Sequence, residues 1–147
     1  MIRRAELRDL SRIAEILVFV KRIQFRPIFQ DDAYSFGELQ VLAVAKECSD
    51  PKILDQIWVY DDKGIVKGLI RVIGQEILQL YVDAFFQNQG IGSELLEFAK
   101  DELSASFLWA IEKNTQAIRF YQAHGFRITS NKKYEEGTTE FLVMLER

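Results

Sequence analysis

The sequence has almost none of the residues that form covalent or metal cross-links. Among its 147 residues there are one cysteine, Cys48, and one histidine, His124. A single cysteine excludes an intramolecular disulfide and fits a reducing compartment, so a cytoplasmic protein is expected. One histidine and one cysteine cannot supply the usual nitrogen and sulfur ligands, so no metal site is predicted. Cys48 is interpreted as a packing residue, and His124 as part of a last helical turn before Gly125.

The chain also lacks a large excess of charge of either sign and a long apolar segment. Its 19 Lys and Arg residues stand against 22 Asp and Glu residues, a formal net charge of −3. This balance gives no electrostatic case for nucleic-acid binding. The apolar stretch 16–20 is short and is followed by Lys21 and Arg22, so neither a signal peptide nor a membrane span is predicted. With no repeat or linker, residues 1–147 are expected to form one domain.

A glycine-containing loop is the most informative feature that is present. Gln87-Asn88-Gln89-Gly90-Ile91-Gly92 lies between a predicted strand and an amphipathic helix that also includes Ser93. Glycine lets a phosphate approach the backbone closely, and the first N–H groups of a helix have no partner within it. The loop therefore predicts a site for a phosphate-bearing ligand.

Two well-known phosphate loops fit this segment poorly. A Walker loop needs Lys and then Ser or Thr after its last glycine, but Ser93 and Glu94 follow here. A dinucleotide fingerprint needs a third glycine, where this chain has Leu95. Glu112 does lie about 20 residues further on, the distance that the fingerprint expects. Nucleotide binding and a plain strand–helix turn therefore remain alternatives.

Periodicity and turn residues predict a mixed α/β domain, with helices on both faces of a mostly antiparallel sheet. The first helix is expected to begin at Asp9 or Ser11 and to be interrupted at Pro27, and Asp50-Pro51 is expected to end the second helical region. The predicted strands cover residues 2–4, 53–60, 65–73, 77–82, 107–111, 126–134 and 138–145, and the other predicted helices cover 36–46, 91–103 and 115–124.

A second motif follows the apolar run 107–111. It consists of Asn114, Ala117, Phe120-Tyr121 and Gly125-Phe126. Together with Gln87-x-x-Gly90-x-Gly92 and the opening segment 2–16, it resembles the GCN5-related N-acetyltransferase (GNAT) superfamily. The resemblance extends over nearly the whole chain. It implies a GNAT fold with a central sheet of six or seven strands, in which strands four and five are parallel and splay apart.

The resemblance also implies acetyl-CoA as acyl donor and an amine as acceptor, with direct transfer between them. The diphosphate would bind at the backbone of Gln87, Asn88, Gln89, Gly90, Ile91, Gly92 and Ser93. The pantetheine arm would bind main-chain atoms of Leu80, Tyr81 and Val82, whose side chains are expected to be core residues. The Asn114 side chain would both cap a helix and contact the cofactor arm.

Two catalytic candidates follow from the same resemblance. Tyr121 corresponds to the general acid that protonates the departing thiolate, and its alternative is a core aromatic residue. Glu76 lies where one branch of the family has a glutamate base, although water serves in many members. The acceptor itself stays unidentified, and a homodimer remains open. The rival interpretation of the chain is a non-catalytic module that binds CoA or a nucleotide.

Overall fold

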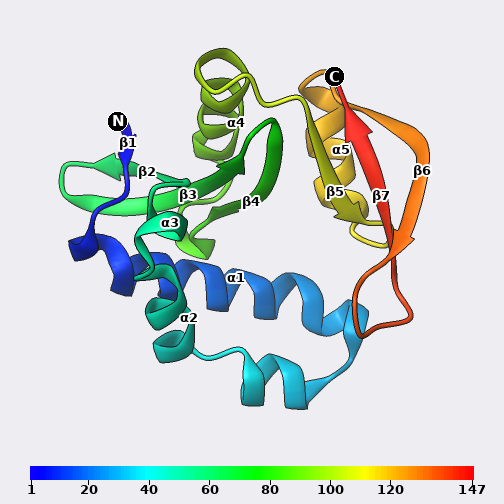
Figure 1. Cartoon of the computed structure of the whole chain (residues 1–147), viewed down its shortest axis with the longest axis horizontal. Helices are drawn as coiled ribbons and strands as arrows, with labels where there is room; N and C mark the ends of the chain where they lie inside the picture. The colour runs from blue at the N-terminus through cyan, green and yellow to red at the C-terminus, as the bar shows by residue number, and fades with distance from the viewer.

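A seven-stranded sheet crosses the computed structural model, which describes residues 1–147 (Figure 1). The strand order is β1-β2-β3-β4-β5-β7-β6, and only β4 and β5 pair in parallel. The mixed α/β class and the seventh strand agree with the sequence prediction. The strands are β1 (Ile2–Arg4), β2 (Ile57–Asp62), β3 (Ile65–Ile73), β4 (Glu76–Val82), β5 (Phe107–Ile111), β6 (Arg127–Tyr134) and β7 (Phe141–Glu146).

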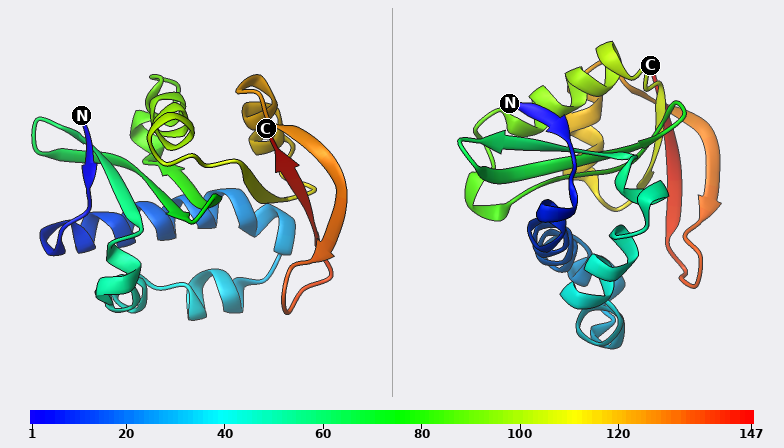
Figure 2. Two further views of the ribbon diagram at one scale, coloured as in Figure 1. Left: turned by 45° about the horizontal axis from the view of Figure 1, so that its top comes forward. Right: turned by 60° about the vertical axis from the view of Figure 1, so that its left-hand side comes forward.

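Helices cover both faces of the sheet. Helices α1 and α2 lie on one face, and α4 and α5 lie on the other (Figure 2). The described helices are η1 (Leu7–Asp9), α1 (Leu10–Phe29), η2 (Ala33–Glu38), α2 (Val41–Cys48), α3 (Pro51–Leu54), η3 (Ala84–Phe86), α4 (Ile91–Glu102) and α5 (Thr115–Ala123). None of them is long and apolar enough to cross a membrane.

Each helical layer has its own apolar core. The buried face of α1, which includes Ile13, Ile16 and Leu17, packs with Cys48 against β2 and β3. The buried face of α4, which includes Leu95 and Leu96, packs on the opposite side with residues from β3, β5, α5 and β7. Cys48 is 5% exposed, and burial raises the pKa of its thiol. It is therefore a packing residue, as predicted.

Three sequence predictions in the first half of the chain are wrong. Pro27 lies inside α1, which continues to Phe29 and ends at Gln30 in the left-handed region (φ 52°). The helix predicted over 36–46 exists as α2 but begins only at Val41 and continues to Cys48, and the π-helical turn η2 occupies residues 33–38 before it. The strand predicted from residue 53 begins at Ile57, because α3 occupies residues 51–54.

Physical causes explain these differences. The Arg22 guanidinium donates hydrogen bonds to the carbonyl oxygens of Ser35 (2.9 Å) and Leu39 (3.0 Å), which fixes η2 against α1. Asp50 accepts a hydrogen bond from the Lys52 N–H at 2.9 Å, and Pro51 is the first residue of α3. An N-cap aspartate followed by proline starts a helix because proline lacks only an N–H that would have no helical partner there.

The parallel pair β4 and β5 separates almost as soon as it forms. Pairing is confined to Glu76 with Phe107 and Ile77 with Leu108. On its other side β4 remains paired with β3 as far as Val82, and β5 remains paired with β7 as far as Ile111. The sheet is therefore continuous at one end and open at the other, which agrees with the expected splayed pair.

Helix α5 ends in a Schellman motif that includes the Gly125-Phe126 pair of the sequence motif. Gly125 has φ 90°, its N–H donates to Gln122, and the Phe126 N–H donates to the Tyr121 carbonyl at 3.1 Å. The rings of Tyr121 and Phe126 meet edge to face at 5.9 Å. The spacing Tyr-x-x-x-Gly-Phe thus fixes the helix end and holds the Tyr121 ring in place.

This helix end gives a first prediction. Gly125→Ala should lower the free energy of unfolding by about 1–2 kcal/mol, because an L side chain is strained at a left-handed φ. Gly37→Ala is the matched control, since Gly37 has no positive φ and an added Cβ meets nothing within 4 Å. Urea unfolding measures both variants. Equal stability of the two would contradict this account of Gly125.

Candidate functional site

A pocket of about 1030 Å³ lies where β4 and β5 separate. Residues 77–81 of β4 and 108–111 of β5 line its sides. One end is lined by residues of α1 and η2, and the other by Asn114, Ala117 and Tyr121. Because α1 and α5 lie on opposite faces of the sheet (Figure 2), the pocket reaches both faces through the opening between the strands.

The predicted phosphate loop lies at the surface, where α4 begins. Asn88 and Gly90 have positive φ values of 63° and 85°, so the backbone turns sharply before Ile91. None of the seven backbone N–H groups from Gln87 to Ser93 donates a hydrogen bond within the chain. The Gln87 side-chain amide donates to the Val82 carbonyl at 3.1 Å, which ties the loop to the end of β4. These free donors at a helix N-terminus form an anion-binding surface.

The structure brings most of the predicted site residues to the pocket. Leu80, Tyr81, Asn114 and Tyr121 line it, whereas Val82 and the loop 87–93 lie outside its lining. Asn114 caps α5, because its side-chain oxygen accepts from the Ala117 N–H at 3.3 Å. This capping role was predicted.

Glu76 is placed differently from the other predicted site residues. It pairs with Ile73 on one side and Phe107 on the other, at the closed end of the parallel pair. It does not line the pocket. Its predicted role as a base therefore gains no support from its position.

Two tyrosine residues that line the pocket have hydroxyl groups without a hydrogen-bond partner. Tyr81 and Tyr121 are each 9% exposed. Neither hydroxyl makes a hydrogen bond, and neither hydroxyl oxygen is completely buried. Burial raises the pKa of Tyr121 well above its usual value, and burial together with nearby Tyr121 does the same for Tyr81. Both phenols are therefore protonated donors at neutral pH.

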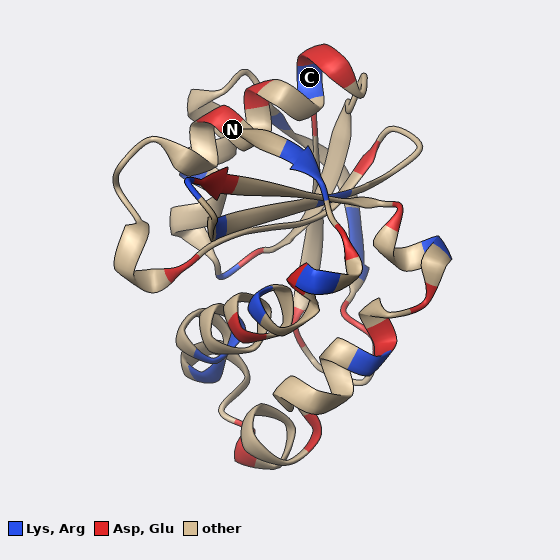
Figure 3. Cartoon of the chain, turned by 90° about the vertical axis from the view of Figure 1, so that its left-hand side faces the viewer, with Lys and Arg blue, Asp and Glu red and all other residues tan.

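The charged side chains that line the pocket are mostly acidic. Five are carboxylates and one, Lys21, is an ammonium group. Burial lowers the pKa of Lys21, while nearby Glu47 and Glu135 oppose that shift. On the rest of the molecule, Lys and Arg residues are interspersed with Asp and Glu (Figure 3). The pocket is thus a local concentration of negative charge. Its carboxylates belong to Asp31, Glu38, Glu135, Glu136 and Glu140.

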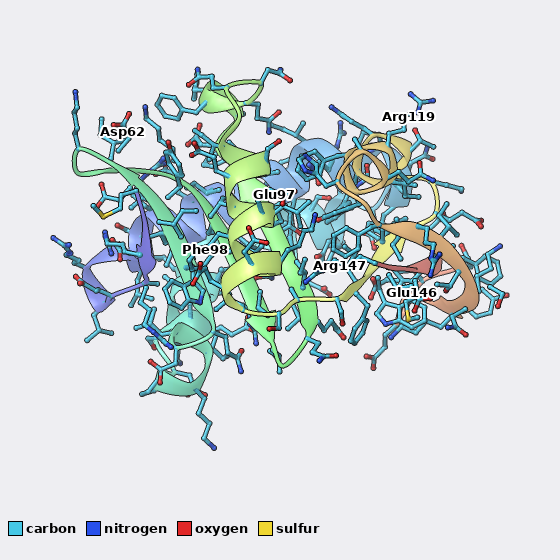
Figure 4. The ribbon with its side chains drawn as sticks, turned by 90° about the horizontal axis from the view of Figure 1, so that it is seen from above. Asp62, Glu97, Phe98, Arg119, Glu146 and Arg147 are labelled. Atoms are coloured by element: carbon cyan, nitrogen blue, oxygen red, sulfur yellow. The ribbon has the colours of Figure 1, made fainter.

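A polar network joins α4 to α5 beside the phosphate loop. His124 Nε2 is hydrogen-bonded to Ser93 Oγ at 3.0 Å, and His124 Nδ1 to Glu97 Oε1 at 2.9 Å. Lys100 donates to Glu97 and to the His124 carbonyl at 3.1 and 2.7 Å. Figure 4 shows Glu97 on α4 and Arg119 on the neighbouring α5. His124 therefore holds the two helices together, a structural role in keeping with its predicted place at the helix end.

A comparison with protein families identifies this arrangement. The family described as "Acetyltransferase (GNAT) domain" matches residues 54–128, which include β4, the loop, α4 and α5. The match extends over slightly more than half of the chain. The chain belongs to the GNAT family.

Known GNAT proteins are similar to this chain over different lengths. The peptidyl-lysine N-acetyltransferase YiaC of Escherichia coli K12 is 31% identical over 74 residues, 50% of this chain and 51% of that protein. The chain thus spans about half the length of the curated relatives that it matches. The solution structure of apo YjaB from E. coli covers 99% of this chain and 95% of its own at a TM-score of 0.78 and 22% identity.

A further solved structure was determined with a ligand. The PaiA N-acetyltransferase of Thermoplasma acidophilum, in complex with coenzyme A, covers 100% of this chain and 98% of its own, with a TM-score of 0.71 and 17% identity. At these identities the structural likeness shows the fold alone.

The sequence did not point to three groups in the pocket of this GNAT domain. The Tyr81 side chain belongs to the first apolar core, as predicted, but it also lines the pocket, which was not predicted. Lys21 was noted only as the end of an apolar stretch. The proximity of Glu135 to Tyr34, Lys21 and Tyr81 depends on how the β6–β7 hairpin folds over α1. No local sequence signal gives that contact.

The buried phenols of this GNAT domain give a second prediction. In the unfolded chain tyrosine ionises near pH 10, whereas burial raises the pKa of Tyr81 and Tyr121 in the folded state. Above about pH 10 the unfolded state therefore loses protons that the folded state keeps, and the free energy of unfolding should fall as pH rises. Below that pH this contribution is fully present.

Urea unfolding between about pH 8 and 11 measures this decline. The Tyr121→Phe variant should show a shallower decline, while its stability at pH 8 serves as the internal control. A decline as steep as in the wild type would mean that the Tyr121 phenol ionises normally in the folded protein.

Proposed function

We propose that this chain binds acetyl-CoA and transfers its acetyl group to the nitrogen of an amine. The observation that carries the proposal is the opening between β4 and β5, next to a helix that begins with unbonded N–H groups. An acyl thioester with a diphosphate-bearing arm needs both features, a channel for the arm and an anion site beside it. Membership of the GNAT family supports the same assignment.

The residues of the loop fit a diphosphate. Seven consecutive N–H groups, from Gln87 to Ser93, have no partner in the chain. The start of α4 adds a partial positive charge from the helix dipole. An added Cβ on Gly92 would contact Phe120 at 3.5 Å and Val82 at 3.7 Å, so this position has room for little more than a methyl group. The backbone of this segment is therefore open to a phosphate.

The open edge of β4 fits an extended arm. From Leu78 onward, the edge of β4 that faces β5 has no strand partner. The main-chain groups of Leu80 and Tyr81 would hold the pantetheine arm and orient the acetyl carbonyl, which supplies the carbon that the amine attacks. Asn114, at the α5 side of the pocket, would contact the same arm. Backbone donors directed at the developing oxyanion provide a large part of such catalysis.

Tyr121 is proposed as the group that donates to the departing sulfur. As the N–C bond forms and the C–S bond breaks, the amine releases one proton and the thiolate takes up one. The raised pKa of Tyr121 keeps its phenol protonated, which suits a donor and excludes a base at neutral pH. Its hydroxyl is unpaired and lines the pocket, so no protein group competes for it. Glu76 lies outside the pocket, so its position favours water as the first acceptor of the amine proton.

A non-catalytic module that binds CoA or a nucleotide would use the same loop. The unpaired, pocket-facing hydroxyl of Tyr121 favours the enzyme. The two functions differ in a direct assay: an enzyme releases free CoA thiol when acetyl-CoA and amines are both present, whereas a binding module does not. Preference for NAD over CoA would favour the nucleotide-binding alternative.

The loop gives a third prediction. Gly90→Ala should weaken acetyl-CoA binding by about tenfold, because a left-handed φ of 85° costs an alanine about 1–2 kcal/mol and the loop will turn its N–H groups away to relieve it. Gly64→Ala is the matched control, since Gly64 has a similar φ of 90° and lies in the turn between β2 and β3, outside the loop, so the same strain should leave acetyl-CoA affinity unchanged. Calorimetric titration with acetyl-CoA measures both. Unchanged affinity in Gly90→Ala would place the diphosphate elsewhere.

Tyr121 gives a fourth prediction. Tyr121→Phe should lower kcat by about 100-fold, because the donor is lost while the ring and its contact with Phe126 remain. Acetyl-CoA affinity should stay close to that of the wild type, because the proton is needed only as the C–S bond breaks. Wild-type turnover by the variant would make Tyr121 a packing residue.

Glu76→Gln is the comparison for Tyr121→Phe in the same steady-state assay. If Glu76 acts only through its place in the sheet, this variant should keep the pH dependence of the wild type. A loss of activity confined to the acidic limb of its pH–rate profile would instead identify Glu76 as the base.

A further inference from the structure

The geometry points to a small aliphatic amine that carries at least one further ammonium group, a diamine or polyamine, as the acceptor of this enzyme. This inference rests on the proposed acetyl transfer and names its substrate class. It is based on the arrangement of charge in the pocket between α1, η2 and the β6–β7 hairpin. Five of the side chains that line this pocket are carboxylates and only one is cationic.

The attacking nitrogen cannot account for this negative charge. An amine attacks a carbonyl only when it is uncharged and has a free electron pair, so in its reactive state it neutralises no carboxylate. Glu38 and Glu136 form no salt bridge within the chain, and Glu135 forms none although it lies near Lys21, whereas Glu140 is paired with Lys113 at 3.0 Å. Carboxylates that face a cavity without a counter-ion favour a ligand that brings its own positive charge.

The acidic groups stand on two walls that face each other. Asp31 and Glu38 belong to the segment around η2, and Glu135 and Glu136 belong to the β6–β7 hairpin. In Figure 1 the hairpin ends close to the end of α1, beside the segment that leads to η2. Glu135 and Glu38 both raise the pKa of Tyr34, so the two walls approach the same ring.

The polarity of the pocket changes with depth. Asp31, Glu38 and Glu136 are exposed and lie at the mouth, whereas Tyr81 and Tyr121 are about nine-tenths buried, line the deeper part and have unpaired hydroxyl groups. Lys21 is the one cation along the lining, and a charged amine is repelled from its surroundings. The neutral nitrogen therefore belongs beside the tyrosines and the ammonium group at the mouth. The rings of Phe25, Phe29 and Tyr34 line the space between and suit both a methylene chain and a cation.

The test compares α,ω-diamines with monoamines of the same length, in which the second amino group is replaced by methyl. With acetyl-CoA saturating, kcat/KM for the best diamine should exceed that of its matched monoamine by about tenfold or more. The advantage should shrink at high salt, because charge attraction at the exposed mouth is screened. A lysine-containing peptide forms a third arm. Equal rates for diamine and monoamine, or a clear preference for the peptide, would overturn the inference.

Two variants test whether the acidic walls cause the preference for the diamine over the monoamine. Glu135→Gln and Glu38→Gln should each lower the ratio of diamine to monoamine kcat/KM, mainly through a higher KM for the diamine. Glu102→Gln is the control, because Glu102 is exposed at the end of α4 and outside the pocket lining, and it should keep the wild-type ratio. An unchanged ratio in both pocket variants would overturn the assignment to these walls.

Calorimetric binding keeps the inference separate from the proposed function. Titrating each amine into the protein in the presence of CoA requires no turnover. If no amine is acetylated but the diamine binds more tightly than the monoamine, the proposed enzymatic function fails while the assignment of the pocket stands. If acetylation occurs but the diamine has no advantage in binding or in rate, the proposed function stands and the diamine inference fails.

Discussion

The separation of β4 from β5 is the constraint on which the rest of the structure depends. Two residue pairs, Glu76 with Phe107 and Ile77 with Leu108, hold the two halves of the sheet together before the strands diverge. Beyond them, each strand keeps its outer partner and loses its inner one. Backbone groups that a continuous sheet would satisfy internally are thereby left for a ligand. As a consequence, few hydrogen bonds connect the half of the sheet that ends at β4 with the half that begins at β5.

The helices supply the connection that the open sheet lacks. Helix α4 follows β4 and α5 follows β5, so each belongs to a different half. Ser93, Glu97 and Lys100 of α4 join His124, at the end of α5, by three hydrogen bonds of 2.7–3.0 Å, and Lys100 also donates to Glu97 within α4. Apolar contacts beneath this network complete the second core. Helix packing, and not strand pairing, therefore fixes the position of the loop relative to Tyr121.

The sequence predicted best where local chemistry decides the structure. The strands 65–73 and 107–111 match β3 and β5 residue for residue, and Gly90 and Gly125 have positive φ at the helix ends where the two motifs place them. The sequence-based predictions were wrong where a side chain far away in the sequence determines the local structure. The start of the predicted helix 36–46 is occupied by η2, where Arg22, on α1, binds the carbonyl groups of Ser35 and Leu39. No local pattern in residues 33–46 contains that information.

The same distinction explains which parts of the site could be predicted. Asn114 and the loop 87–93 act through caps and backbone conformation, which short motifs encode, so their geometry agrees with expectation. In the alternating pattern of its strand, Tyr81 occupies an interior position, so the sequence does not distinguish it from any other core residue. It reaches a cavity only because the strand beside it departs after two residue pairs.

The side chains that line the pocket are therefore brought together by tertiary contacts that the two sequence motifs do not determine. The family motifs fix where a thioester arm can lie. The walls of the proposed acceptor site come from η2 and the β6–β7 hairpin, which lie outside those motifs. A fold of this kind can keep one donor site and change its acceptor by altering two short surface segments. In this chain those segments bring carboxylates and aromatic rings to the mouth of the opening.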